Sequence, residues 1–424
     1  MMARIHVRIA IAVACCVTLL AGWALAKDVD AEAPPRTPLQ LALLNPMQLF
    51  DQDYDVYGLR INLLYGSNTS VYGLDLGLFN DCVRDLYGIQ AGIISNMVSG
   101  VGSSGDGLLG VQIAGLFNYA ESRASGHGPR GIQIAGICNY TPGAKGYFQA
   151  AGIFNLATDA DFTGVQVAGL LNIGVKTMTG LAIAGLVNHT TAGFAGIRAG
   201  GWGNYTEGDM AGVQIAGVIN VTVRGSVSGL EAALICNASY NEHYRVDKPT
   251  GDPTLRGIQL AGLYNDGHAM LTGAQITLGG NMAGYFAAAP EAGNSFLQLA
   301  GGFNYCVRKF TGAQVAGVLN LADSLSGVQV AGVANIIYGD SGSLTGRREG
   351  DLRGMQVSLG LNSTNLDVYG CQVGLINVAD RVKGVQIGLV NIARRVYGVQ
   401  IGLANFISEG AVPFFPIVNF STSF

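Results

Sequence analysis

The chain repeats one short phrase almost from end to end. Gly-Val-Gln-Ile-Ala-Gly-Leu-Phe-Asn stands at residues 110–118, Gly-Ile-Gln-Ile-Ala-Gly-Ile-Cys-Asn at 131–139, and a shorter form, Gly-Val-Gln-Ile-Gly-Leu-Val-Asn, at 384–391. Aligned on the Gln, 22 copies begin at residues 38, 58, 73, 88, 110, 131, 147, 164, 180, 196, 212, 229, 257, 273, 296, 312, 327, 354, 370, 384, 398 and 412. A period this regular means that one supersecondary unit is stacked many times.

Each copy predicts a β-strand followed by a turn. Val, Ile or Leu at the second and fourth positions alternates with Gln and a small residue, which is the period of a strand. The Gly and Asn that follow favour a turn, because both residues tolerate left-handed backbone angles. Composition agrees: with 49% hydrophobic and only 12% charged residues, the chain is not disordered. A collagen triple helix is also excluded, because the chain has only 11 Pro beside its 63 Gly.

Two all-β architectures fit these strands. One is an elongated parallel β-solenoid, and the alternative is a 22-stranded antiparallel outer-membrane β-barrel. The solenoid is favoured because parallel stacking places Gln on Gln and Asn on Asn, and because the long spacings do not alternate as barrel loops would. The terminal copies also carry Pro38, Pro46, Pro413 and Pro416, which suit open ends better than a closed barrel. The even strand number and the terminal Phe424 favour the barrel.

The amino-terminal end predicts an exported protein. A basic start, an apolar run over 9–20 and Ala-Leu-Ala at 24–26 are typical of a cleaved signal peptide. We therefore expect a signal peptide over 1–26, a linker over 27–37 and a single β-repeat domain over 38–424, with capping copies at both ends. The expected location is the cell surface, outer membrane or periplasm of a bacterium.

The sequence offers little chemistry for catalysis. Neither the His nor the Cys residues after the signal occur at metal-ligand spacing, and no P-loop, nucleophile elbow or dinucleotide fingerprint is present. We therefore expect a non-enzymatic protein without metal or cofactor; a polysaccharide-acting β-helix enzyme is a less favoured alternative. The formal net charge of −4 argues against binding to nucleic acid.

Four charged residues replace the Gln of the repeat. Arg60 and Asp75 belong to adjacent copies and predict a stacked ion pair that stabilises the amino-terminal end. Arg198 and Glu231 lie two copies apart, with Gln214 between them, and could line one patch. We rank this patch low as a binding site and lower as a catalytic one.

Long insertions between copies are the main candidates for recognition, since loops on a rigid scaffold carry function. They span 97–109, 119–130, 238–256, 282–295 and 336–353. The third holds a mixed-charge segment with aromatic character that we select as the candidate binding site: Glu242, His243, Tyr244, Arg245, Asp247 and Lys248. The expected partner is a protein, a glycan or an envelope component, with outer-membrane association possible; solvated loops without a partner are the plainer alternative.

The repeat also resembles an uncharacterised family of bacterial secreted and surface-repeat proteins. The resemblance rests on the phrase Gly-(Val/Ile)-Gln-(Ile/Val)-(Ala)-Gly-x-x-Asn and covers residues 38–419. Val56-Tyr-Gly-Leu-Arg-Ile-Asn-Leu-Leu-Tyr-Gly and Val71-Tyr-Gly-Leu-Asp-Leu-Gly-Leu-Phe-Asn look like that family's first copies. The resemblance implies an exported, envelope-associated protein and supplies no catalytic residues. The non-enzymatic role we expect is to present loops on a rigid β-stack; the rival role, tied to the barrel, is an outer-membrane pore.

Overall fold

A computed structural model describes residues 34–100, 107–121, 129–142, 144–240, 254–267, 270–284, 294–339 and 351–422. These residues are all-β, and no helix among them is long and apolar enough to cross a membrane. The chain divides into two compact units, Met1–Ile113 with Tyr119–Pro129, and Ala114–Asn118 with Arg130–Phe424. The single repeat domain expected from the sequence stays a prediction.

The first unit contains β1 (Arg36–Leu44), β2 (Met47–Gln48) and β3 (Asp55–Val98), followed by most of β4 (Leu108–Ala114). β1 pairs in parallel with the start of β3, so that Gln40 lies beside Arg60 at the Gln position of the repeat. The short β2 turns back and pairs antiparallel with β1. The first parallel coil therefore ends in a small hairpin.

The second unit contains most of the repeats. β5 (Phe117–Ala120) lies across the boundary between the units. The strands that follow are β6 (Arg130–Ala135), β7 (Cys138–Thr141), β8 (Ala144–Ala151), β9 (Phe154–Ala157), β10 (Phe162–Ala168), β11 (Leu171–Gly174), β12 (Met178–Ala184), β13 (Val187–Thr190), β14 (Phe194–Gly200), β15 (Gly203–Thr206), β16 (Met210–Ala216), β17 (Ile219–Val223), β18 (Val227–Ala233) and β19 (Cys236–Tyr240). They continue with β20 (Thr254–Ala261), β21 (Tyr264–Gly267), β22 (Met270–Thr277), β23 (Gly280–Ala283), β24 (Asn294–Ala300), β25 (Phe303–Ala316), β26 (Leu319–Ala331), β27 (Ala334–Ile337), β28 (Leu352–Ser358), β29 (Leu361–Val373), β30 (Ile376–Ile387), β31 (Val390–Ile407) and β32 (Phe414–Ser421).

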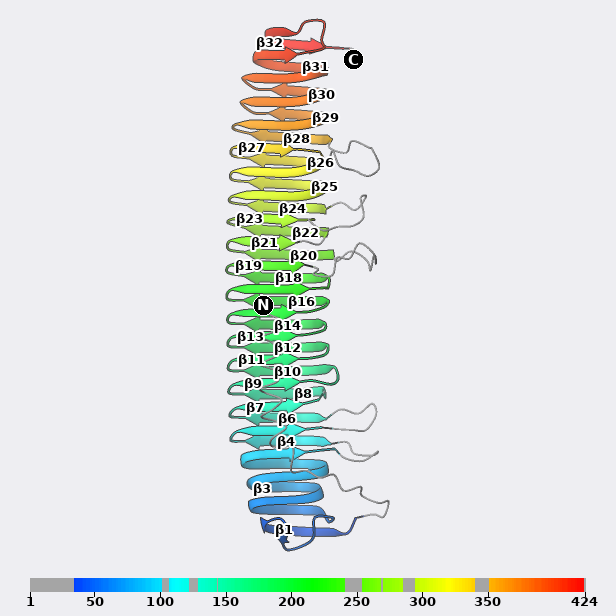
Figure 1. Cartoon of the computed structure of the whole chain (residues 1–424), viewed down its shortest axis with the longest axis vertical. Coiled ribbons are helices and arrows are strands. Elements are labelled where there is room, and N and C mark those ends of the chain that lie inside the picture. Colours follow the sequence, from blue (N-terminus) through cyan, green and yellow to red (C-terminus); the bar gives the residue numbers. More distant parts are fainter. Residues whose placement is uncertain are drawn as a thin grey trace. The chain divides into compact units, whose positions relative to one another are not determined.

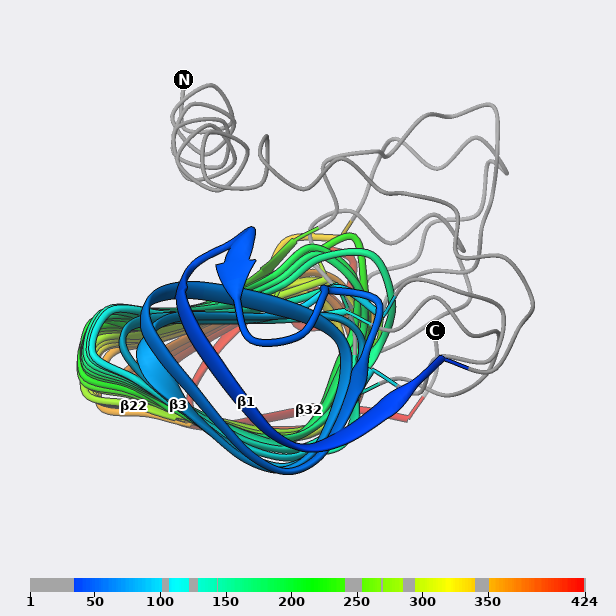
Figure 2. The ribbon, with the colours of Figure 1, turned by 90° about the horizontal axis from the view of Figure 1, so that it is seen from below.

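Successive coils of the second unit pair in parallel and in register. A coil such as β10–β11 lies on the coil β12–β13 with Gly164 beside Gly180 and Asn172 beside Asn188. Figure 1 shows these strands one above another, and Figure 2 shows that they superpose coil on coil when seen along the stack. The predicted parallel β-solenoid is therefore confirmed, and the antiparallel barrel is wrong.

The last copy differs from the others. The sequence predicts a parallel coil beginning at 412, but β32 pairs antiparallel with β31, placing Asn419 beside Gln400. Phe414 stands where the repeat needs Gln, so it cannot extend a ladder of side-chain amides. Pro416 also lacks the N–H that another parallel coil would require. The chain turns back on itself and closes this end of the stack.

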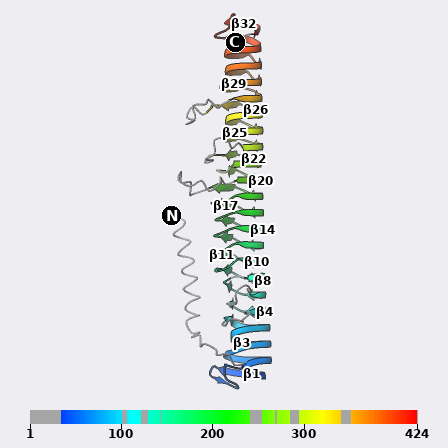
Figure 3. The same cartoon turned by 90° about the vertical axis from the view of Figure 1, so that its right-hand side faces the viewer.

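Around the Gln of each copy, alternation places the Gln side chain inside and the aliphatic residue on either side of it outside, while an apolar residue near the start of the strand, such as Met210 in β16, is buried. In β16, Gln214 is fully buried whereas the next residue, Ile215, is 49% exposed. The Asn that follows the turn, Asn220, is also fully buried. At the Gln and Asn positions the usual preference for aliphatic side chains inside is inverted, whereas other inward positions keep it, as in the buried apolar cluster of Met210, Val227, Leu255, Leu271 and Ala283. Figure 3 shows the same coils of the second unit from the side.

Ladders of hydrogen bonds satisfy the buried amides. Gln386 Nε2 donates to Gln372 Oε1 at 2.8 Å, and the same bond links the Gln residues of many other coils. In the second ladder, Asn377 Nδ2 donates to Asn391 Oδ1 at 2.8 Å and to the Ile387 carbonyl at 2.9 Å. A buried amide is tolerated when its donors and acceptors are paired, so identical side chains in successive coils stabilise one another.

The Gly that opens most copies allows the coils to stack closely. Gly212 has φ +118°, and a Cβ at this position would lie 2.1 Å from the Gly196 carbonyl oxygen of the preceding coil. A side chain there would therefore meet both an unfavourable backbone angle and a backbone clash. The repeated Gly is thus required by the spacing of the coils.

Candidate functional site

The candidate binding residues, Glu242, His243, Tyr244, Arg245, Asp247 and Lys248, lie outside the described residues. The structure does describe the strands on either side of them. Asn237 Nδ2 donates to Asn265 Oδ1 at 3.0 Å, as it would between copies of ordinary spacing. The Asn ladder is therefore continuous between the two coils that flank the insertion.

The predicted Arg60–Asp75 ion pair is confirmed. Arg60 Nη2 lies 2.6 Å from Asp75 Oδ2, and both side chains are fully buried. Asp75 also accepts hydrogen bonds from Asn62 at 3.0 Å and from Gln90 at 2.8 Å. Burial acts to lower the pKa of Arg60, but the charge and hydrogen bonds of Asp75, together with Cys82 and Asp81, raise it overall. The carboxylate continues the Gln ladder in the first unit, which is a structural role.

The predicted patch of Arg198 and Glu231 is wrong as a surface feature. Both side chains are fully buried at the Gln position of β14 and β18. The alternation in the sequence distinguishes the two faces of a strand but does not tell which face is buried. These two residues lie on the inner face. They cannot contact a partner, but Gln214 does lie between them as expected.

These residues reverse the direction of the Gln ladder. Elsewhere the amide of one coil donates to the carbonyl oxygen of the preceding coil. Here Arg198 Nη2 donates to Gln214 Oε1 at 2.5 Å, and Gln214 Nε2 donates forward to Glu231 Oε1 at 3.1 Å. Gln259 Nε2 donates to the other oxygen of Glu231 at 2.8 Å. The reversal follows because a guanidinium only donates and a carboxylate only accepts.

The electrostatics of this cluster reflect its burial. Burial lowers the pKa of Arg198 to about 9, although Glu231 acts in the opposite direction. Burial raises the pKa of Glu231, opposed by hydrogen bonds from Gln259 and Thr222 and by Arg198. Both side chains are shielded from solvent and hydrogen-bonded to neighbouring coils. We therefore attribute their shifted pKa values to packing within the stack.

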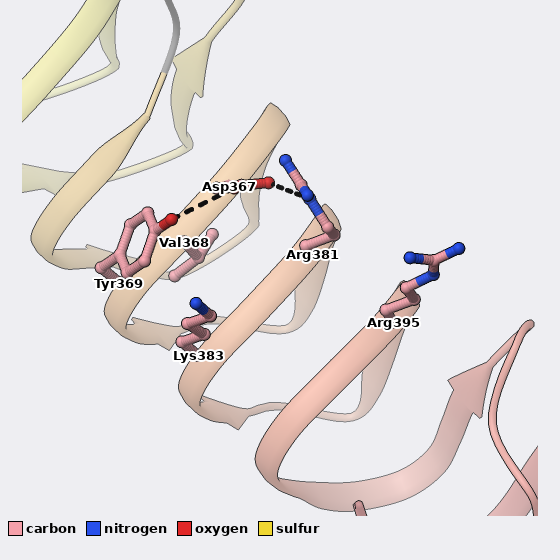
Figure 4. Close-up of a pocket in the computed structure, with 6 residues that line it drawn as sticks. All are labelled: Asp367, Val368, Tyr369, Arg381, Lys383 and Arg395. Atoms are coloured by element: carbon pink, nitrogen blue, oxygen red, sulfur yellow. Dashed lines mark hydrogen bonds and ion pairs between the residues drawn. The ribbon is translucent and has the colours of Figure 1, made fainter. Parts of the chain in front are cut away.

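Charged side chains do meet on the outside of the last coils of the second unit. Asp367, Arg381 and Arg395 lie side by side in three successive coils. Arg381 Nε is 2.6 Å from Asp367 Oδ1, and Arg395 Nε is 2.5 Å from Glu409 Oε2. Figure 4 shows Asp367, Arg381 and Arg395 along the edge of the three coils. They form a charged column.

A second column, of Tyr and Lys, lies beside the charged one. Lys383 pairs in register with Tyr369 and Tyr397, and its Nζ lies 5.3 Å from the Tyr369 ring centroid. The Tyr369 hydroxyl donates to Asp367 Oδ2 at 3.3 Å. The hollow lined by both columns has a volume of about 160 Å³, which is below the usual size of a ligand pocket.

The charge states of these columns suit ion pairing. Hydrogen bonding to Asp367 and its charge raise the pKa of Arg381, while burial and then Asp367 raise that of Tyr369. Hydrogen bonds from Arg395 and Arg394 lower the pKa of Glu409. The arrangement can hold polar or charged groups of a partner.

The sequence analysis missed these columns. The signal was available, because Asp367-Val-Tyr-Gly, Arg381-Val-Lys-Gly and Arg395-Val-Tyr-Gly precede three successive copies in the same phase. Within the described residues, no group of three or more His, Cys, Asp or Glu side chains could hold a metal ion.

An open apolar groove follows the corner of the same coils. Its volume is about 580 Å³, and it is lined by exposed Leu359, Leu375, Leu389 and Leu403 from four successive coils and by Ile417 of β32. The sequence shows these Leu residues at the turn of each copy but does not show that they remain uncovered. Comparisons with family models, with curated proteins and with solved structures found no match to this chain.

Proposed function

We propose that this chain is a non-enzymatic, exported repeat protein whose stacked coils form a rigid scaffold that presents inserted segments to a partner at the bacterial cell envelope. The observation that carries the proposal is the register across the longest insertion. Residues 229 and 257 begin consecutive copies 28 residues apart, yet Leu230 pairs with Ile258 and Glu231 with Gln259 as in an ordinary pair of coils.

Other insertions support the same reading. Gln298 Nε2 donates to Gln275 Oε1 at 2.8 Å, and Gln356 Nε2 donates to Gln329 Oε1 at 2.9 Å. Each of these bonds bridges an insertion. The stack accepts inserted residues between consecutive copies without losing its ladders, so the inserted segments are free to differ from one another. Binding residues are commonly placed on such segments of a rigid fold.

Two other functions are less well supported. The outer-membrane pore depended on an antiparallel barrel, and the chain forms parallel coils. A polysaccharide-acting enzyme needs reactive groups accessible to substrate, but Arg198 and Glu231 are enclosed in the stack. The export signal over 1–26 and the resemblance to secreted surface-repeat proteins support placement in the envelope.

Removal of residues 241–253 tests the proposal. This deletion joins the end of β19 to the start of β20 and reduces the spacing from 28 to 15 residues, within the range of other copies. Removal of 285–293 is the matched control, since it reduces the spacing of the copies at 273 and 296 from 23 to 14. Both variants should keep the β-sheet circular dichroism of the full chain.

The binding measurement is affinity capture from solubilised envelopes, with each captured protein or glycan compared among the full chain and both deletions. We expect a partner that the full chain captures, that the variant lacking 241–253 does not capture, and that the variant lacking 285–293 still captures. Retention of every partner by both folded deletion variants would show that the candidate segment is not the binding site.

A further inference from the structure

One outer face of the second unit is apolar in every coil. Its two rows consist of the second and fourth residues of each copy, which point away from the buried Gln between them. The first row runs in register from Ile132 to Val399 and the second from Ile134 to Ile401. Every position in both rows holds Ala, Val, Ile, Leu, Met, Phe or Cys.

A third apolar row adjoins these two at the corner of the coils. Leu170, Leu186, Trp202 and Val218 follow one another there, joined by backbone hydrogen bonds of 2.8–3.0 Å. Trp202 is 57% exposed and Leu186 is 45% exposed. We name the three rows together the apolar face.

The apolar face is larger than a soluble monomer usually exposes. Coils repeat about every 4.8 Å, so rows of some 16 coils cover on the order of 1,000 Å². The largest exposed apolar patch of a typical monomer is about 300–600 Å². An uncovered face of this size marks an interaction surface.

The border of the apolar face is cationic. The row beside the first one consists of the residue before the opening Gly of each copy and begins at Lys145, which a register shift aligns with Thr163; it runs in register to Tyr397. The row includes the exposed Lys145, Arg256, Arg353 and Lys383, and it includes no Asp or Glu. Most of its other members are Thr, Ser or Ala.

The aromatic members of the border lie among its cations. Tyr369 lies between Arg353 and Lys383 in register, and Tyr397 follows Lys383 and is 52% exposed. Tyr beside Lys or Arg at the edge of an apolar surface is typical of side chains at the headgroup level of a membrane. The aromatic ring and the long aliphatic stem can contact acyl chains while the polar end stays hydrated.

We propose that the apolar face lies on a lipid leaflet with anionic headgroups. The aliphatic rows contact the acyl-chain boundary, and the cationic border meets lipid phosphates. A second copy of this chain is a poorer occupant. Opposite the cationic border, the rows at and beyond the corner of the coils hold no series of acidic residues that could pair with the border of another copy. This inference goes beyond the presentation of inserted segments and does not depend on it.

Trp202 provides a native probe of this contact. The chain has two Trp residues, and Trp23→Phe leaves Trp202 alone on the corner row. This full-length variant is mixed with vesicles of phosphatidylcholine with phosphatidylglycerol, and separately with phosphatidylcholine alone. The expected result is a shift of Trp202 emission to shorter wavelength, and quenching by lipids brominated in their acyl chains, with the anionic vesicles.

Two apolar residues beside Trp202 test the face itself. Ile183 and Ile215 flank the Trp202 coil on the second row and are 40% and 49% exposed. I183E with I215E should abolish the emission shift, because carboxylates would face the anionic leaflet. V175E is the matched control, since Val175 is also 40% exposed but lies beyond the end of β11, away from the face.

The cationic border is tested by K145Q, R256Q, R353Q and K383Q. Each basic residue near an anionic leaflet contributes about fivefold to binding, so each substitution should weaken binding to the anionic vesicles by about that factor. Circular dichroism and continued protection of the buried Cys306 thiol establish that each variant is folded.

Three results would overturn the proposal. The first is no change in Trp202 emission with anionic vesicles. The second is an equal change in the control V175E and in I183E with I215E. The third is a dimer in sedimentation analysis that I183E with I215E disrupts, together with no vesicle binding, which would identify a second copy as the occupant. Loss of an envelope partner on removal of 241–253 is a separate result and leaves this test unaffected.

Discussion

Replacement of Arg198 and Glu231 by Gln, singly and together, tests the account of the ladder reversal. The double variant R198Q with E231Q restores Gln at both positions. All amides from 198 to 259 can then point in the direction found elsewhere in the stack. Each single variant instead leaves one buried charge without its counterpart, which typically costs about 3–5 kcal/mol when a buried pair is broken.

The magnitude for E231Q follows from the geometry. Arg198 and Glu231 are separated by two coil spacings, roughly 10 Å, so at an effective dielectric constant of about 20 their attraction is about 1.7 kcal/mol. In E231Q, the Nε2 groups of Gln214 and Gln259 would also compete for one carbonyl oxygen. One buried donor is left unpaired, at about 1–3 kcal/mol. The expected loss of local stability is therefore about 3–5 kcal/mol.

The double variant should recover most of this loss. The remaining difference from the natural chain is the space that Arg198 fills beside Ala182 and against the Phe194 ring, 4.7 Å from the guanidinium. Removal of that packing should cost about 1 kcal/mol, on the scale of one buried methylene. The two single effects are thus expected to be strongly non-additive.

The pH dependence of R198Q gives an independent check. The pKa of Glu231 is raised in the folded chain, and loss of Arg198 removes a group that lowers it. A carboxyl with a raised folded pKa stabilises the fold below its unfolded pKa, near 4.5, and this stability is lost as pH rises through the folded pKa. R198Q should therefore approach the stability of the natural chain near pH 4 and fall below it toward pH 7.

Hydrogen exchange of peptides covering 194–237 measures the local opening free energy in each variant, which avoids assuming that so long a stack unfolds in one step. The matched control is the exposed ion pair of Arg224 and Glu207, 3.2 Å apart. R224Q, E207Q and their combination should each change stability by less than about 1 kcal/mol. Our reasoning is refuted if R198Q with E231Q loses as much stability as the two single variants added together.

The other predictions concern the close approach of coils, the Asn ladder and the buried thiols. Gly212→Ala should lower local stability by more than about 3 kcal/mol in hydrogen exchange, whereas Gly146→Ala, also at positive φ but with no atom within 4 Å of the added Cβ, should lose only about 1–2 kcal/mol; equal losses would contradict the stacking argument. Asn220→Ala removes donors to Asn237 Oδ1 and the Ala232 carbonyl, both at 2.9 Å, and should destabilise the neighbouring coils by about 3–5 kcal/mol; an unchanged exchange pattern with loss of a binding activity would assign the ladder a functional role instead. The Cys306 side chain is fully buried, and burial raises the pKa of its thiol, whereas Cys371 is partly exposed on the apolar face. A thiol reagent at pH 8 should therefore modify Cys371 in the folded chain and Cys306 only after unfolding. Early modification of Cys306 would mean that the core opens locally.

The sequence by itself determined the repeat and the strand in each copy, and it favoured parallel stacking over an antiparallel barrel. These follow from period and identity: a Gln and an Asn that recur at one phase gain hydrogen bonds only when like lies on like. It also predicted the Arg60–Asp75 pair, because adjacent copies at the same phase must be neighbours in a stack. The same logic placed Gln214 between Arg198 and Glu231.

Only the tertiary structure decided which side of each strand faces inward. Alternation distinguishes two faces but assigns neither to the core, and the usual rule would bury Ile215 and expose Gln214. The ladders reverse that rule at the Gln and Asn positions, because hydrogen bonds to the coils on both sides offset the desolvation cost of the buried amide, while the aliphatic residues beside the Gln are left outside. The antiparallel turn of β32 was likewise not visible, since Pro416 shows where parallel pairing must stop but not where the chain then goes. The apolar face and its cationic border exist only once the register fixes which residues of distant copies lie side by side.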